Sequence, residues 1–188
     1  MIELSHIERI FQVSDQQVHA LRDVDLSITR GEYTSIMGPS GSGKSTLLNI
    51  AGQLDRSDSG RYQLDGADVT SLSEQQHART RRDKIGFVFQ SFHLVARLTA
   101  AENVELPMIL AGIEPDLRKP RMQQALQAMG LENRAHHKPE QLSGGQRQRV
   151  APARAAANSH GGWGVVADQQ QLLRKKVECF YCAIHTGT

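Results

Sequence analysis

Apolar and polar residues alternate over short stretches in the first part of the chain, a pattern typical of β-strands with one buried face. Residues 2–13 read as a strand and a turn, and residues 24–28 read as a second strand. Between residues 62 and 69, two short apolar stretches flank Asp65-Gly66, a dipeptide that predicts a tight hairpin turn. The N-terminal region is therefore expected to form antiparallel strands.

Further along the chain, strands and helices are predicted to alternate. Tyr33–Met37 reads as a short strand, and Ser45–Ala51 reads as a helix that ends at Gly52. Ile85–Phe89 is a compact apolar strand that ends at Gln90. These elements predict an α/β domain.

Two capping boxes mark the beginnings of further helices. Ser73–Gln76 opens a helix that should run to about residue 83, and Thr99–Glu102 opens one that should end near residue 112. Pro107 is expected to kink the second of these helices, because proline lacks the backbone donor and clashes with the preceding turn.

A third helix is predicted before Gly130 from apolar residues at helical spacing, namely Met122, Ala125, Leu126 and Met129. Methionine at this spacing is expected to fill a hydrophobic core rather than to serve a function. Residues 91–142 therefore read as a helical insert in the α/β domain.

A glycine-rich turn between the predicted strand 33–37 and its helix carries the first chemical signal. It fits the pattern G-x-x-x-x-G-K-[ST] with the residues Gly38, Pro39, Ser40, Gly41, Ser42, Gly43, Lys44, Ser45 and Thr46. Glycines let the backbone approach an anion, and the loop amides can then surround phosphate oxygens. Lys44 would reach the β- and γ-phosphates of a nucleotide, and the Ser45 hydroxyl would bind Mg²⁺. The alternative is a chance glycine- and serine-rich loop.

A second anion site is predicted at residues 142–149, which read Leu-Ser-Gly-Gly-Gln-Arg-Gln-Arg. Ser143 is a good N-cap, and the two glycines after it expose backbone amides at a helix start. One nucleotide rarely needs two such sites in one chain. Two copies arranged head to tail would use both, each nucleotide lying between one chain's loop and the other chain's helix start.

With these motifs the chain resembles the nucleotide-binding subunits of ABC transporters. The motifs are the phosphate loop at 38–45, Gln90 after an apolar strand, and the signature at 142–146. The residues at 86–92 and 98–104 are similar to the lipoprotein-release and macrolide-export branch of that family.

The resemblance implies a P-loop NTPase (RecA-like) core with N-terminal antiparallel β-strands and an inserted α-helical subdomain. The core would comprise residues 1–90, the helical subdomain 91–142 and the signature helix 143–158. The resemblance runs to about residue 158, so the sheet would be incomplete at the C-terminus. Residues 159–188 would then be a poorly ordered tail that does not match the family.

The resemblance also implies roles for individual residues. Phe11 matches the aromatic residue that stacks on adenine, although it could equally be a core residue. Gln90 would contact Mg²⁺ and the attacking water and, with Lys44, serve catalysis. Ser143, Gly144 and Gly145 would contact the γ-phosphate of the nucleotide that the partner chain holds. Gln146 completes this signature motif.

Beyond the signature, the family pattern is lost. The family requires an apolar strand that ends in Asp-Glu, and only a faint echo occurs at 165–168, where Gln169 stands in place of Glu. Asp168 is therefore a weak catalytic candidate, and Gln169 cannot act as a carboxylate base. Pro152 interrupts the predicted signature helix at a cost of roughly 3 kcal/mol. A shifted reading frame or a truncation would explain the change after residue 158.

Composition and charge indicate the cellular compartment and the kinds of partner to expect. The chain has 188 residues, 39% of them hydrophobic, and a formal net charge of +2. This mild charge gives no indication of nucleic-acid binding, and the basic residues at 79–84 read as a solvated helix face. Without a signal peptide or an apolar run of ~18 residues, the chain is expected to be cytoplasmic and to reach a membrane only through a permease.

Two functions remain in competition. The first is a Mg-ATP-hydrolysing subunit that works as a dimer beneath a membrane permease, which is the ancestral role that the resemblance implies. The second is a module that binds ATP or ADP without turnover. A P-loop kinase is a weaker third reading, because kinases have no use for the 142–146 signature.

Overall fold

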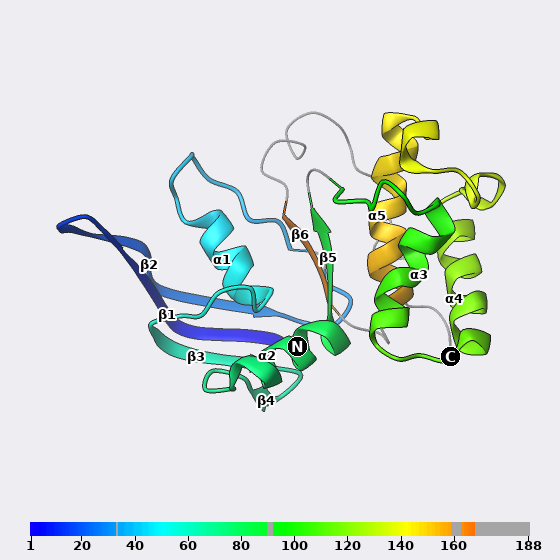
Figure 1. The fold of residues 1–188 in the computed structure, drawn as a ribbon. Coiled ribbons are helices and arrows are strands. Elements are labelled where there is room, and N and C mark those ends of the chain that lie inside the picture. The colour runs from blue at the N-terminus through cyan, green and yellow to red at the C-terminus, as the bar shows by residue number, and fades with distance from the viewer. Residues whose placement is uncertain (33, 90–91, 159–162, 168–188) are drawn as a thin grey trace. The chain divides into compact units, whose positions relative to one another are not determined.

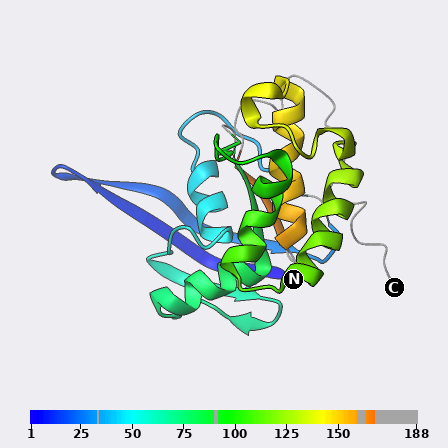
Figure 2. The ribbon, with the colours of Figure 1, turned by 45° about the vertical axis from the view of Figure 1, so that its right-hand side comes forward.

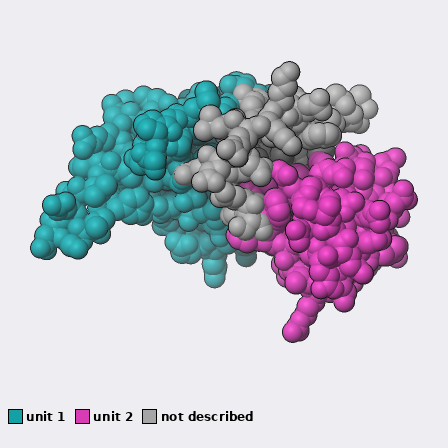
Figure 3. Space-filling view, turned by 90° about the horizontal axis from the view of Figure 1, so that it is seen from above, with its two compact units in different colours: residues 1–81, 177–188 teal, residues 82–176 magenta. Residues whose placement is uncertain are grey.

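The computed structural model describes residues 1–32, 34–89, 92–158 and 163–167. The chain divides into two compact units, which Figure 3 shows in different colours. Unit 1 comprises residues 1–81 and 177–188, and unit 2 comprises residues 82–176.

Unit 1 contains a four-stranded antiparallel sheet in the order β2-β1-β3-β4. Its strands are β1 (Ile2–Val13), β2 (Gln16–Ile28), β3 (Ser59–Leu64) and β4 (Ala67–Asp68). The antiparallel N-terminal strands predicted from the alternating pattern are thus confirmed, although β2 begins well before residue 24. The β1–β2 hairpin extends beyond helix α1 in both ribbon views (Figure 1 and Figure 2).

The predicted turn at Asp65-Gly66 joins β3 to β4. Both residues have positive φ, 52° and 81°, as a type I′ hairpin turn requires. Leu64 pairs with Ala67 across this turn. A local dipeptide was therefore sufficient to predict this connection.

Helix α1 belongs to unit 1, and helix α2 begins in unit 1 and ends three residues into unit 2. Helix α1 (Lys44–Ala51) buries Leu47 and Ile50, and the hydroxyl of Tyr62 on β3 donates to the carbonyl of Ala51 at 2.6 Å. Helix α2 (Glu74–Lys84) begins at the capping box predicted from Ser73–Gln76, with both of its hydrogen bonds formed. The buried apolar residues of the sheet and α1 include Ile2, Leu4, Ile7, Leu21, Leu47, Ile50, Tyr62 and Leu64.

The strand predicted at Tyr33–Met37 is not formed over its described part. Residues 34–37 belong to no strand, and Met37 is 80% exposed, while Tyr33 lies outside the described residues. A strand is stable only when a neighbouring strand satisfies its backbone N–H and C=O groups. In the described part of the chain no strand pairs with residues 34–37.

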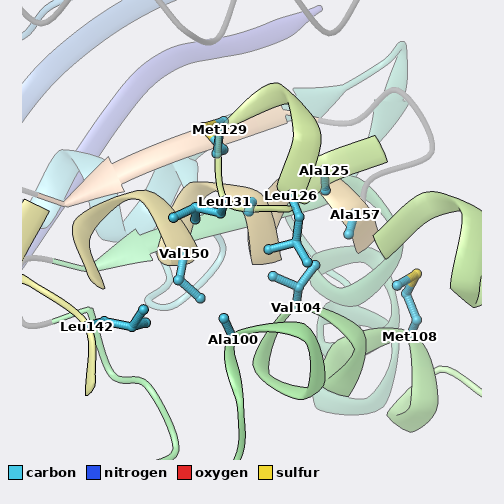
Figure 4. Packing of buried hydrophobic residues seen from close by; sticks show 11 residues of the cluster. Ala100, Val104, Met108, Ala125, Leu126, Met129, Leu131, Leu142, Val150 and Ala157 are labelled. Carbon is cyan, nitrogen blue, oxygen red and sulfur yellow. The ribbon is translucent and has the colours of Figure 1, made fainter. Parts of the chain in front are cut away.

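Unit 2 packs three helices around one apolar cluster (Figure 4). The helices are α3 (Ala100–Leu110), α4 (Pro115–Ala128) and α5 (Gly144–Asn158), with short 3₁₀ turns at Glu132–Arg134 and Pro139–Gln141. Both hydrogen bonds of the predicted Thr99–Glu102 capping box open α3. The cluster comprises Ala100, Val104, Met108, Ala125, Leu126, Met129, Leu131, Leu142, Val150, Ala153 and Ala157.

The core role predicted for the methionine at 129 is confirmed, since Met129 is only 6% exposed. Helix α5 continues through Pro152, and the residues on either side of this proline, Ala151 and Ala153, are completely buried. Burial on both sides of the proline offsets the lost hydrogen bond, because tertiary packing supplies most of the stability of a helix in a protein.

Unit 2 also contains a parallel pair of strands, β5 (Ile85–Phe89) and β6 (Trp163–Ala167). A Cβ built at Gly86 would lie 3.1 Å from the Ala155 side chain, so β5 and α5 pack closely. Strand β6 lies within the segment 159–188 for which a poorly ordered tail was expected, and its five residues pair in register with β5. Residues 159–162 and 168–188 lie outside the described residues.

Candidate nucleotide-binding site

The glycine-rich turn before α1 has the backbone geometry of an anion-binding loop. Gly41 and Gly43 adopt left-handed conformations, with φ of 81° and 82°. Gly43 is the N-cap of α1, no side chain caps this helix, and its first backbone bond runs from Leu47 N–H to Gly43 C=O. The N–H groups of the first turn therefore face an open helix end, where the helix dipole favours an anion.

The same turn packs tightly against strand β2. A Cβ added to Gly43 would collide with the backbone carbonyl of Ala20 and come within 3.0 Å of the Leu21 side chain. A Cβ at Gly38 would lie 2.7 Å from the Ser42 hydroxyl. Gly43 is thus required by the fold of the loop itself, whereas a rotation of the Ser42 hydroxyl would make room at Gly38.

The Lys44 side chain folds back over the phosphate loop. Its Nζ donates to the carbonyl of Pro39 at 2.6 Å and to the Ser42 hydroxyl at 3.2 Å. An ammonium group has three donors, so one remains for a ligand. The side chain of Ser45, the predicted Mg²⁺ ligand, is exposed beside it, and Thr46 is half-buried.

Phe11 lies near the end of the β1–β2 hairpin and is 37% exposed, which does not fit a core residue. It pairs with Val18 on β2. The Arg9 guanidinium carbon is 4.7 Å from the centre of its ring. Arg9 itself pairs with Leu21, the residue that packs against Gly43, so the Phe11 ring and the phosphate loop lie over the same face of the hairpin.

Sequence reasoning missed an ion-pair network beside Phe11. Arg9 contacts Asp55 with two nitrogens, at 2.9 and 3.2 Å, and Asp58 with a third at 2.8 Å. In the sequence the segment 54–60 reads only as a polar loop. Its acidic residues were the one available signal, and they did not identify a partner 46 positions away.

The signature turn begins α5 in unit 2. The Ser143 N–H donates to the Gln146 side-chain oxygen at 2.8 Å, and the Gln146 N–H donates to the Ser143 hydroxyl oxygen at 3.2 Å. Leu142 is buried in the apolar cluster, while residues 143–145 are exposed. The turn is therefore fixed from behind and accessible in front. The Ser143 hydroxyl proton remains available for an anion, whereas the Gln146 oxygen is used within the cap.

The two remaining predicted site residues, Gln90 and Asp168, lie outside the described residues. They follow the last residues of β5 and β6, Phe89 and Ala167, which pair in register. Among the described residues no group of three or more His, Cys, Asp or Glu side chains could bind a metal ion.

Arg154 of α5 is a further residue that the motifs did not identify. It donates to the carbonyls of Phe92 and His93, at 2.9 and 2.8 Å. Both acceptor residues have positive φ, 58° and 42°, which is strained for side chains of this size. Burial lowers the pKa of Arg154, but an arginine remains charged in proteins. The signature helix therefore supports the segment that follows Gln90.

Comparison with known proteins identifies the family. A family model described as ABC transporter matches residues 21–161. An uncharacterized ABC transporter ATP-binding protein, YknY of Bacillus subtilis (strain 168), is 52% identical over 158 residues. That match covers 84% of this chain and 69% of the relative.

A second group of relatives carries a permease in the same chain. The macrolide export ATP-binding/permease protein MacB of Hahella chejuensis is 48% identical over 169 residues, covering 90% of this chain and 26% of MacB. The chain thus spans about a quarter of the length of these relatives. Among the described helices of this chain, none has the length and apolar character needed to cross a membrane.

Solved structures extend the agreement to the fold. The dimeric structure of MJ0796, a bacterial ABC transporter cassette, superposes with a TM-score of 0.75 at 48% identity, covering 84% of this chain and 70% of that one. A post-hydrolysis dimer of the same cassette, bound to ADP and Pi, gives the same TM-score at 47% identity. The α/β fold is thus that of solved ABC cassettes, and the chain belongs to the ABC transporter family as one of its ATP-binding ATPase cassettes.

Proposed function

We propose that this chain binds Mg-ATP at the loop 38–46 and that a second copy completes the site with its signature turn at 143–146. Nucleotide binding would close two copies together, and hydrolysis would release them. A membrane permease would convert this movement into transport. Through that partner the chain would work in the cytoplasm, at the inner face of the membrane.

One observation carries the phosphate part of the proposal. The uncapped start of α1 presents backbone N–H groups, and the Lys44 ammonium lies over the same loop with a donor to spare. A triphosphate needs both charge neutralisation and a nest of donors, and these groups supply them. Phe11, on the same face of the hairpin, would stack on the adenine ring.

The exposed signature turn supports assembly with a second copy. Residues 143–145 are exposed at the start of α5, and a Cβ built at either glycine would meet no atom within 4 Å. An anion brought by another chain could therefore reach the amides and the Ser143 hydroxyl. The relative MJ0796 is dimeric in its solved structures.

Magnesium would be held by the Ser45 hydroxyl and by the γ-phosphate, with Gln90 as a further ligand. The ion would neutralise the charge that develops on the transferred phosphoryl group. Asp168 is a weaker candidate for the carboxylate that this chemistry needs.

A second candidate function is nucleotide binding without turnover. It is favoured by Gln169, which stands where a catalytic carboxylate is expected, because an amide cannot accept the proton of the attacking water at neutral pH. In that case the chain would bind ATP or ADP at the same loop and would not hydrolyse it.

The deciding experiment measures ATP affinity and the ATPase rate on the same preparation. Lys44→Ala should weaken ATP binding by about 10- to 100-fold, because a hydrogen-bonded charge is removed from the phosphates. Lys119→Ala, which removes the same charge from an exposed position of α4, serves as the control and should change neither quantity. Unchanged affinity in Lys44→Ala would refute the phosphate site. Tight binding with no turnover would favour the second candidate.

A further inference from the structure

The guanidinium of Arg9 is held on several sides at once. Asp55 accepts from its Nε and Nη2, and Asp58 accepts from its Nη1 at 2.8 Å. The Arg9 side chain is only 21% exposed, so these bonds are partly shielded from water. A bidentate pair fixes the plane of a guanidinium as well as its position. One face of that fixed plane lies against the Phe11 ring, at 4.7 Å from its centre.

The loop that carries both carboxylates is itself fastened to β1. Asp58 donates its N–H to the carbonyl of Glu8 at 2.9 Å and accepts from the N–H of Ile10 at 2.6 Å. The loop therefore bonds to the backbone on both sides of Arg9. Asp55 also donates its N–H to the carbonyl of Asn49, within the last turns of α1.

These contacts make a continuous connection between the two ends of the proposed nucleotide site. Helix α1 begins at the phosphate loop and ends at Gly52. The loop at 55–58 follows α1, binds Arg9, and Arg9 lies against Phe11. The position of the ring is thus set relative to the helix whose first turn receives the phosphates.

We propose that Arg9 is a positioning residue for nucleotide binding, which holds one face of the Phe11 ring so that the other face receives the base. The proposal rests on the proposed function, in which Phe11 stacks on adenine. Arg9 contacts no part of the nucleotide in this scheme. It acts by keeping the ring, which is exposed on a hairpin, in one orientation before the base arrives, so that less freedom is lost on binding.

The test is a double-mutant cycle read with two ligands, ATP and inorganic tripolyphosphate, by titration calorimetry in Mg²⁺. Phe11→Ala should weaken ATP binding about tenfold, as expected for a lost base–aromatic stack. Arg9→Gln should weaken it by about three- to tenfold, and Arg9→Gln combined with Phe11→Ala should be no weaker than Phe11→Ala alone. Tripolyphosphate, which has no base, should bind all three variants as it binds the parent chain.

Two further variants sharpen the test. Arg9→Lys keeps the charge but cannot form the bidentate pair, so it should behave like Arg9→Gln. Arg61→Gln removes an arginine from the same sheet that pairs with Asp68 and is 61% exposed, and it should leave ATP affinity unchanged. Circular dichroism at the assay temperature establishes that each variant is folded.

The outcomes separate this proposal from the one on which it rests. Equal losses of ATP and tripolyphosphate affinity in Arg9→Gln would show that Arg9 shapes the phosphate loop, which overturns the proposal. The proposal would also be overturned if the double variant lost ATP affinity by the product of the two single-variant losses, because Arg9 would then act independently of the ring. If Phe11→Ala has no effect, adenine stacking fails together with this proposal, whereas phosphate binding is judged separately by Lys44→Ala.

Discussion

Replacing Gly43 by alanine should destabilise unit 1 for two reasons that can be separated. Gly43 has φ of 82°, and an L-residue in this left-handed region costs about 1–2 kcal/mol. The added Cβ would also collide with the carbonyl of Ala20 and approach Leu21 to 3.0 Å. Forcing a methyl group into a packed site typically costs about 1–3 kcal/mol. Together the two effects should lower the free energy of unfolding by about 2–5 kcal/mol.

Gly41 provides a matched control in the same loop. Its φ is 81°, so alanine there meets the same backbone cost, but a Cβ at this position would meet no atom within 4 Å. Gly41→Ala should therefore lose only about 1–2 kcal/mol. The difference between the two variants isolates the close approach of the phosphate loop to β2.

Thermal unfolding without nucleotide, followed by circular dichroism, measures both variants. For a chain of this size each kcal/mol shifts Tm by about 2–4 °C. Gly41→Ala should lower Tm by about 2–8 °C, and Gly43→Ala by about twice as much. Equal shifts for the two variants would refute the reasoning, because the contact with Ala20 would then contribute nothing.

Three further predictions concern residues that the motifs do not include. Asn103 is completely buried and bonds through its amide to four backbone groups between residues 95 and 99, so Asn103→Ala should cost about 2–4 kcal/mol in urea unfolding. Arg154→Ala removes both hydrogen bonds to the strained carbonyls at 92–93, and amide hydrogen exchange in the following residues should become faster. The hydrogen bond from His6 to Asp23 raises the pKa of His6 above 6.5, so its contribution to stability is complete below pH 6.5 and is lost as pH rises through the folded-state pKa. An NMR titration should show this raised pKa return toward 6.5 in Asp23→Asn.

The parts of the fold that the sequence predicted correctly depend on neighbours within a few positions. Thr99 and Glu102 exchange hydrogen bonds across one helical turn, so their spacing alone located the start of α3. Asp65-Gly66 likewise specifies its own turn. The exposed signature at 143–145 followed from the N-cap chemistry of one serine and two glycines.

The parts that failed depend on partners far along the chain. Residues 34–37 have the composition of a strand, but pairing decides whether a strand forms, and no described strand pairs with them. Residues 165–168 read only as a faint echo of the family's strand, yet residues 163–167 pair with β5 in full register. No local pattern indicates that Arg9 will bind Asp55, because that contact closes a loop of 46 positions.

Gly43 fits the motif, but the usual explanation for this glycine gives only one of the two constraints on it. In the pattern G-x-x-x-x-G-K-[ST], this glycine is explained by the approach of phosphate to the backbone. The structure adds a second constraint on the opposite side of the residue. In the β1–β2 register His19 pairs with Ile10 and Leu21 pairs with Arg9, which leaves Ala20 as the extra residue of a β-bulge, and its carbonyl faces Gly43. A side chain at position 43 is therefore disfavoured by the fold even before a nucleotide binds, and the hairpin that carries Phe11 also constrains the phosphate loop.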